Sequence, residues 1–218
     1  MQKFLLIIPT IIVLTTSAHA EQNQFYGKTN IGFSKFSNQN LGIGDDKIKF
    51  KAQNTGFIGV SGGYYLMNNV RIELALDYFF NPMHKYSSIT DDGDKFEAKF
   101  KSHVTSLLVN SYVDLFDINV AKIFVGAGVG MARVKTKLEF RVDNGAVPSL
   151  KSKTSNAFSY ALHIGTSTEF SPNIHGELVY SYRDMGKTKK FQHDGETVPY
   201  SSIKFKAHNV AVGVRFNI

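Results

Sequence analysis

The chain has 218 residues, a formal net charge of +7 at pH 7 and no cysteine, so it is the size of one domain and cannot contain disulfide bonds or thiolate metal sites. Its 18 phenylalanines, 10 tyrosines and 18 glycines, with only 5 prolines, favour β-sheet over helix. The basic charge points to anionic partners without identifying them.

The first twenty residues have the pattern of a secretory signal peptide. Lys3 precedes an apolar run over residues 4–14, and small residues at 18 and 20 supply a small-x-small cleavage site, which we expect between Ala20 and Glu21. The apolar run is too short to span a bilayer, and no later stretch reaches the ~18 consecutive apolar residues of a transmembrane helix. The exported chain is therefore either a soluble protein or a β-barrel, and we expect no nucleic-acid partner.

Eight segments alternate apolar and polar residues with the period of two that is typical of β-strands. They cover residues 25–34, about 49–66, 70–81, 106–115, 121–132, 158–170, 174–183 and 208–218. In the third segment the face opposite the apolar one carries Arg71, Glu73 and Asp77, and a soluble core would not face these charges. We therefore expect the apolar face to point outward into lipid.

Short turns and long loops alternate between these segments. The turns lie at 67–69, 116–119 and 171–173, and the loops lie at about 37–48, 82–96, 139–153 and 185–203. Short turns on one rim and long loops on the other are typical of outer-membrane barrels whose termini lie in the periplasm. The sequence thus predicts an all-β fold, an eight-stranded antiparallel up-and-down transmembrane β-barrel over residues 21–218, with four surface loops.

An outward apolar face places charged side chains in the lumen. The predicted lumenal set is Lys28, Arg71, Glu73, Asp77, Asp114, Lys122, Glu169, Glu177, Arg183 and Arg215. Side chains fill the lumen of an eight-stranded barrel, and a buried charge without a partner is unfavourable, so we expect these groups to pair into a plug. The alternative is a path for protons or ions through the same network.

The sequence gives little indication of catalysis or of a metal site. His163 and His175 are predicted to face inward as polar filling, His208 lies near the outer rim, and no nucleophile-elbow pattern is present. The acidic run at 91–94 lacks the glutamate that a calcium loop carries at its twelfth position, so it indicates a solvated turn. We expect no enzyme activity, cofactor or metal.

Basic residues gather at the third and fourth long loops. This candidate partner-binding rim comprises Lys135, Lys137, Arg141, Lys151, Lys153, Lys187, Lys189, Lys190, Lys204 and Lys206. Long-range attraction could draw such a rim to lipopolysaccharide phosphates, host glycosaminoglycans or acidic patches on host proteins. Alternatively, the lysines only solvate the loops and extend along the interface.

Four stretches resemble a known family. They are GVSGGYYLMNNVRIELALDYFF at 59–80, LVNSYVDLFDINVAKIFVGAGVGMARV at 108–134, FSYALHIGTSTEFSPNIHGELVYSYRDMGKT at 158–188 and HNVAVGVRFNI at 208–218. Together they are similar to the opacity-type outer-membrane β-barrel proteins, especially the small adhesin-type members from rickettsia-like intracellular bacteria. The resemblance covers nearly the whole mature chain and implies an eight-stranded barrel whose surface loops bind host-cell proteins.

We therefore expect a monomer in the lipid of an outer membrane that acts as an adhesin and binds a host-surface or serum protein through its loops. One alternative is a structural or small-solute barrel without an adhesive role. Another is a soluble exported barrel of the lipocalin type, which would hold its apolar residues inside.

Overall fold

The computed structural model describes residues 24–43, 46–89, 95–118, 120–142, 145–146, 150–152, 154–187, 191–193, 196–197 and 204–218. The predicted signal peptide at 1–20, its cleavage site between Ala20 and Glu21, and the acidic run at 91–94 lie outside these residues. The described part of the chain contains no helix that is long and apolar enough to cross a membrane.

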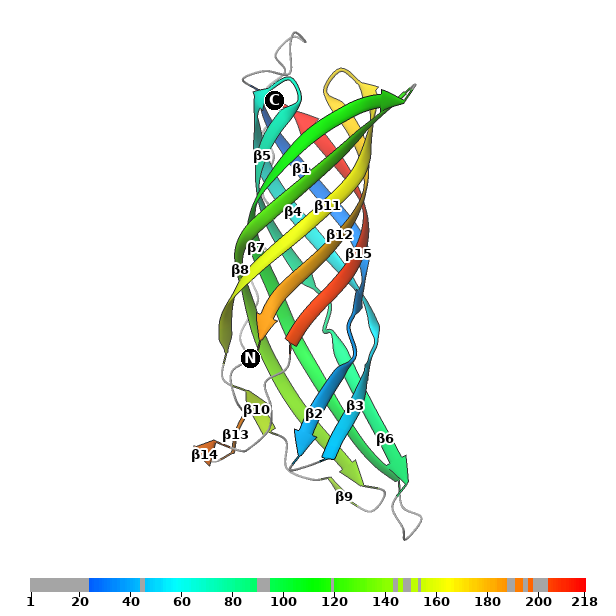
Figure 1. The fold of residues 1–218 in the computed structure, drawn as a ribbon, viewed down its shortest axis with the longest axis vertical. Coiled ribbons are helices and arrows are strands. Elements are labelled where there is room, and N and C mark those ends of the chain that lie inside the picture. Colours follow the sequence, from blue (N-terminus) through cyan, green and yellow to red (C-terminus); the bar gives the residue numbers. More distant parts are fainter. Residues whose placement is uncertain are drawn as a thin grey trace, which may run out of the picture.

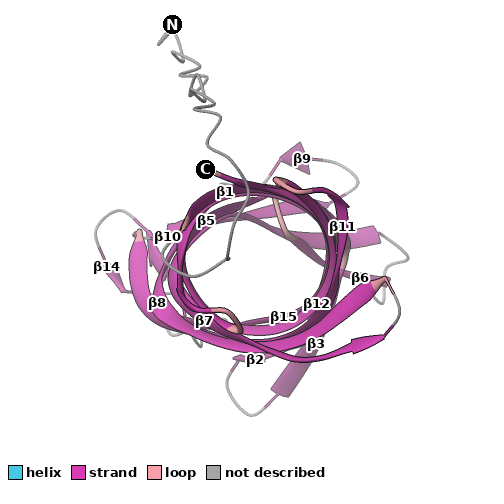
Figure 2. Cartoon of the chain, turned by 90° about the horizontal axis from the view of Figure 1, so that it is seen from above, coloured by secondary structure: helices cyan, strands magenta, loops and turns pink. Residues whose placement is uncertain are grey.

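Eight long antiparallel strands close into a barrel (Figures 1 and 2). They are β1 (Phe25–Phe36), β4 (Asn54–Met67), β5 (Val70–Phe79), β7 (Lys95–Ile118), β8 (Ala121–Val142), β11 (Ser155–Ser171), β12 (Ile174–Lys187) and β15 (Lys204–Asn217). Each pairs with the next of these strands along the chain, and β15 pairs back with β1. Closure leaves no barrel edge with unpaired backbone groups, as lipid requires, and the predicted fold is confirmed.

The apolar face of the sheet points outward, as the alternation predicts. Leu74, Leu178 and Val212 are 54%, 50% and 56% exposed, whereas Glu73 and Glu177 are 3% and 5% exposed. Exposing such an apolar surface to water is unfavourable, whereas contact between this surface and the acyl chains of a bilayer is favourable. This orientation excludes the soluble barrel of the lipocalin type.

The two ends of the barrel differ. Short turns at 68–69 and 172–173 lie at one end, where Figure 1 also places the C-terminus. At the opposite end β7 and β8 continue to lengths of 24 and 22 residues. Seven short strands lie beside them: β2 (Gln39–Ile43), β3 (Asp46–Ala52), β6 (Met83–Ile89), β9 (Gly145–Ala146), β10 (Leu150–Ser152), β13 (Phe191–His193) and β14 (Glu196–Thr197).

The segments predicted as four long surface loops also contain strands, which the sequence analysis did not predict. Each predicted loop contains strand residues, and β6 pairs with β7 while β3 pairs with β6. The sheet continues past the apolar band because β6 forms hydrogen bonds with the backbone of the β7 extension, on the side of β7 that does not face β8. The Asn-, Gly- and Asp-rich composition of these segments concealed the strands.

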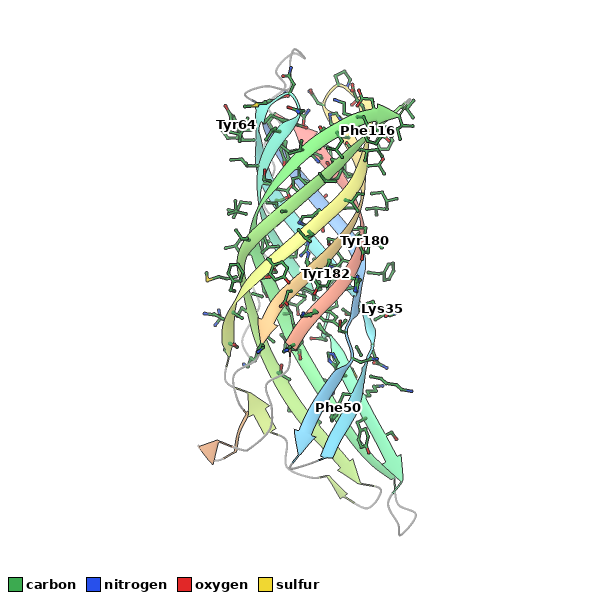
Figure 3. All side chains as sticks on the ribbon, viewed as in Figure 1. Lys35, Phe50, Tyr64, Phe116, Tyr180 and Tyr182 are labelled. Atoms are coloured by element: carbon green, nitrogen blue, oxygen red, sulfur yellow. The ribbon has the colours of Figure 1, made fainter. Side chains whose placement is uncertain are left out.

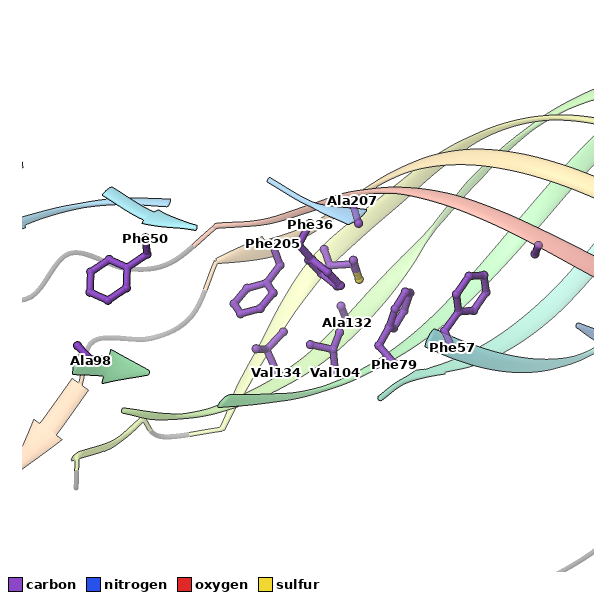
Figure 4. Packing of buried hydrophobic residues seen from close by; sticks show 12 residues of the cluster. Phe36, Phe50, Phe57, Phe79, Ala98, Val104, Ala132, Val134, Phe205 and Ala207 are labelled. Atoms are coloured by element: carbon purple, nitrogen blue, oxygen red, sulfur yellow. The ribbon is translucent and has the colours of Figure 1, made fainter. Parts of the chain in front are cut away.

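The lumen is apolar at the end of the barrel that carries the extensions, a feature that the sequence analysis missed (Figure 4). The cluster comprises Phe36, Phe50, Phe57, Phe79, Ala98, Val104, Ala132, Val134, Met185, Phe205, Ala207 and Ala211. The Phe57 and Phe79 rings stack with centroids 5.2 Å apart, and Phe36 meets Phe79 edge-on at 5.8 Å. This cluster forms a hydrophobic plug in the lumen, between the polar network and the end of the barrel that carries the extensions.

Candidate binding surface and lumen

The polar half of the lumen is built around the carboxylate of Glu177. This side chain from β12 forms ion pairs with Lys28 of β1, Arg71 of β5 and Arg215 of β15, and the Nζ of Lys28 lies 3.5 Å from Oε2. Arg71 Nη2 lies 3.3 Å from Oε1 of the same carboxylate. One anion thus joins three strands that are far apart in the sequence.

Glu73 and Asp77 on β5 complete the network. The Nζ of Lys28 lies 2.6 Å from Oε2 of Glu73, and the hydroxyls of Tyr26 and Tyr112 donate hydrogen bonds to the Glu73 carboxylate at 3.2 and 3.4 Å. Arg183 Nη1 lies 2.6 Å from Oδ2 of Asp77. The guanidinium of Arg183 also lies 5.6 Å from the centroid of Phe57, so it joins the polar network to the hydrophobic plug.

Charge is balanced within this network. Four cations face four carboxylates when Asp114 is counted, whose Oδ1 lies 2.7 Å from Arg71 Nη1. A cavity of about 30 Å³ lies among these groups, which is room for about two water molecules. Balanced pairing and a small cavity under an apolar plug describe a filled lumen.

Glycines on the inward face make room for the aromatic members of the network. A Cβ at Gly63 would overlap the ring of Tyr26, and a Cβ at Gly126 would overlap the ring of Tyr112. These rings are the groups that carry the hydroxyl donors to Glu73. The glycine run near residue 126 therefore has a packing role in the lumen.

Two of the ten predicted lumenal residues lie outside the closed network. Lys122 is half-buried and Glu169 is exposed, and both line a cavity at the barrel mouth together with His175. This mouth is at the short-turn end, where a register shift follows Glu169 in β11. The alternation of side chains directs Lys122 and Glu169 inward. Both residues lie near the ends of β8 and β11, closer to the short turns than the level at which the cations and carboxylates of the network pair.

The structure distributes the candidate rim over two regions. Lys135 and Lys137 lie on the outer face of β8, whereas Lys187 lies opposite Lys204 on β12 and β15. Lys206 Nζ lies 3.4 Å from Oδ2 of Asp184. The side chains of Arg141 and Lys151, and the whole of Lys153, Lys189 and Lys190, lie outside what the structure describes.

A basic surface of which the sequence analysis named only Lys137 crosses β3, β6, β7 and β8. The register places Lys51 opposite Lys85, Lys85 opposite Lys99, and Lys101 opposite Lys137, all on outward positions. We call these five lysines the tip surface. The signal in the sequence was their shared odd-numbered parity, but nothing in it indicated that β3 and β6 pair.

Glu139 is the acidic residue within this surface. Its carboxylate lies 2.8 Å from Lys101 Nζ and 2.9 Å from Lys137 Nζ. Hydrogen bonds from these two lysines lower the pKa of Glu139 to about 2. One carboxylate is therefore shared between two cations and stays ionised at neutral pH.

Aromatic residues also lie on the outer face of the barrel. Tyr180 and Tyr182 lie on the outer face of β12, as Figure 3 shows, and the hydroxyl of Tyr180 is 2.7 Å from Nδ1 of His208. The ring of Tyr182 also meets the rings of Tyr160 and His208 in tilted contacts, and aromatic side chains on the outer face of a membrane barrel are typical of an interface girdle. The described residues contain no cluster of three or more His, Asp or Glu side chains that could hold a metal ion.

Comparisons agree with this architecture. The family described as outer membrane protein beta-barrel domain matches residues 6–216. A Rickettsia conorii protein named "Putative adhesin RC1281" is 37% identical over 207 residues, covering 90% of this chain and 83% of that protein. A Rickettsia massiliae protein named "Putative adhesin" is 32% identical over 231 residues, covering 100% of both. The crystal structure of OprG from Pseudomonas aeruginosa, 13% identical, covers 91% of this chain and 97% of its own with a TM-score of 0.56, which shows the shared fold.

Proposed function

This chain belongs to the outer membrane protein β-barrel domain family, and we propose that it is a surface adhesin whose tip surface binds an acidic region of a host-surface or serum protein. The observation that carries the proposal is the row of lysines on paired strands, Lys51 opposite Lys85 and Lys85 opposite Lys99. The adhesin names of the relatives support the same role.

Like charges on directly opposed strand positions destabilise a sheet. The tip surface repeats this arrangement in two rows, and Glu139 offsets it for Lys101 and Lys137 in the second row. This repulsion between lysines lowers the stability of the sheet. A partner that supplies negative charge would remove the repulsion on binding, which gives the lysines a role in binding. Attraction of this kind also raises the association rate and falls with ionic strength.

The tip surface is high enough above the membrane to meet a partner. Met131 is the last outward apolar residue on β8, and Lys137 follows six residues later, about 20 Å along the strand. A headgroup layer is only about 5–8 Å deep. Lys137 and Lys101 opposite it therefore extend beyond the lipid headgroups.

A cell-binding assay tests the proposal. Vesicles that carry the folded barrel are labelled and added to cultured mammalian cells, with Lys51, Lys85 and Lys101 changed to Glu in one variant. We expect binding to fall at least fivefold, and to fall for the unchanged protein when salt is raised. The matched control is Lys35→Glu, an exposed lysine on β1 outside the tip surface. Unchanged binding by the triple variant would refute the mechanism.

The filled lumen disfavours the small-solute alternative. Glu177 and its three cations occupy the polar half, and the hydrophobic plug occupies the other. We expect planar bilayers with the reconstituted barrel to show no steady conductance. A steady conductance would support a pore instead.

A further inference from the structure

A second basic patch lies on β7 and β8 directly above the apolar band. It comprises His103, Arg133 and Lys135, and all three side chains are exposed. The register places Lys135 opposite His103 and Arg133 opposite Thr105, so the three basic groups share one outer face of two paired strands. We call it the interface patch; it borders the tip surface, whose Lys101 and Lys137 occupy the next outward row of the same two strands.

The change from apolar to basic residues takes a single step along the strands. Leu107, Met131 and Phe158 form one row across β7, β8 and β11 and are 43%, 60% and 67% exposed. Arg133 follows Met131 by two residues, about 7 Å along the strand, in a row that also contains Asn156. Since a headgroup layer is about 5–8 Å deep, Arg133 lies at the depth of lipid headgroups.

Lys135 can reach the same depth. It stands two residues farther from the membrane than Arg133, but a lysine stem is long enough for the ammonium group to extend back along the sheet. Below it, the apolar band on β8 runs from Ala121 to Met131, about 33 Å along the strand, and a strand tilt of about 40° turns this length into a height of about 25 Å, as expected for such a band. The patch thus borders the hydrocarbon region and does not lie within it.

The two charged groups of the patch, Arg133 and Lys135, are not neutralised within the described part of the protein. Neither forms an ion pair there, and the nearby carboxylate of Glu139 is shared by Lys101 and Lys137. On β12 and β15, by contrast, Lys206 is paired with Asp184. Lys35 on β1 stands opposite His208 and Asn54.

We infer that the interface patch binds the phosphate groups of an anionic glycolipid of the lipid A type in the outer leaflet. Arg133 offers a planar fork of donors that matches a phosphate, and Lys135 adds a point charge. The acyl chains of the same lipid would lie on Met131 and Phe158, which continue the site into the hydrocarbon region. The leaflet follows from the position of the patch, because the long extensions of such barrels face the cell exterior.

Native mass spectrometry of the detergent-solubilised barrel with added lipid A tests this site. We expect one lipid A molecule to be retained by the unchanged protein, and its apparent Kd to rise at least tenfold in a double variant with Arg133→Gln and Lys135→Gln. Lys35→Gln is the matched control and should change the Kd less than twofold. The heat-dependent gel shift of a folded barrel confirms that each variant is folded.

Three results would overturn the proposal. The first is unchanged affinity in the double variant while its gel shift is intact. The second is an equal loss in Lys35→Gln, which would indicate unspecific attraction to net charge. The third is equal retention of phosphatidylglycerol, a phosphodiester without the phosphomonoesters of lipid A. The tip variant with Lys51, Lys85 and Lys101 changed to Glu should keep lipid A binding, so the failure of one proposal is distinguishable from the failure of the other.

Discussion

Replacing Glu177 by Gln tests whether the lumenal network holds the barrel together. The substitution keeps the shape of the side chain but leaves four cations facing three carboxylates, because Glu177 contacts Lys28, Arg71 and Arg215. Breaking a buried ion pair costs about 3–5 kcal/mol, and we take the lower end because the amide oxygen still accepts a hydrogen bond. With an m-value of about 2 kcal/mol/M, a loss of about 3 kcal/mol lowers the urea midpoint by about 1.5 M.

Urea titration in lipid vesicles, followed by the gel shift, measures this change, since the chain has no tryptophan for fluorescence. Glu169→Gln is the matched control, because this exposed carboxylate at the barrel mouth should contribute less than about 0.5 kcal/mol. Adding Arg215→Met to Glu177→Gln restores the balance of charge and should recover part of the loss. A Glu177→Gln midpoint equal to that of the unchanged protein would refute the argument.

Two further predictions concern the outer half of the molecule. Phe79→Ala should lower the free energy of unfolding by about 3–5 kcal/mol, because Phe79 is fully buried in the hydrophobic plug. The control Phe80→Ala removes the neighbouring lipid-facing ring and should lower the free energy of unfolding clearly less. Equal losses of the two variants in urea titrations would contradict the plug. Lys101 and Lys137 lower the pKa of Glu139 to about 2, so its contribution to stability is complete above pH 4.5 and is lost as the pH falls from 4.5 towards 2. A carbon NMR titration of this carboxyl measures the midpoint, which should rise with salt because both lysines are exposed, and a midpoint near 4.5 at low salt would show that the ion pairs are absent.

The sequence alone determined which face of each strand meets lipid. Side chains alternate between the two faces of a strand, and in the segments predicted at 70–81 and 208–218 the charged residues lie on the face opposite Leu74 or Val212. Because the charged face has to avoid lipid, Leu74 and Val212 point outward. The number of strands and the difference between the two rims followed from turn residues in the same local way. Strand order and register then came from the fold.

Only the tertiary structure decided depth and neighbours. Parity placed Glu169 and Glu177 in the same lumen, but the stagger of the strands puts Glu177 among three cations and Glu169 at the mouth. The inward phenylalanines were equally hidden, because an apolar residue is acceptable both in lipid and in a packed lumen. The tip surface needs Lys51 beside Lys85, a pairing between the start of the strand predicted at about 49–66 and a segment predicted as a loop. Alternation is a property of one strand, whereas a binding surface depends on the register between several.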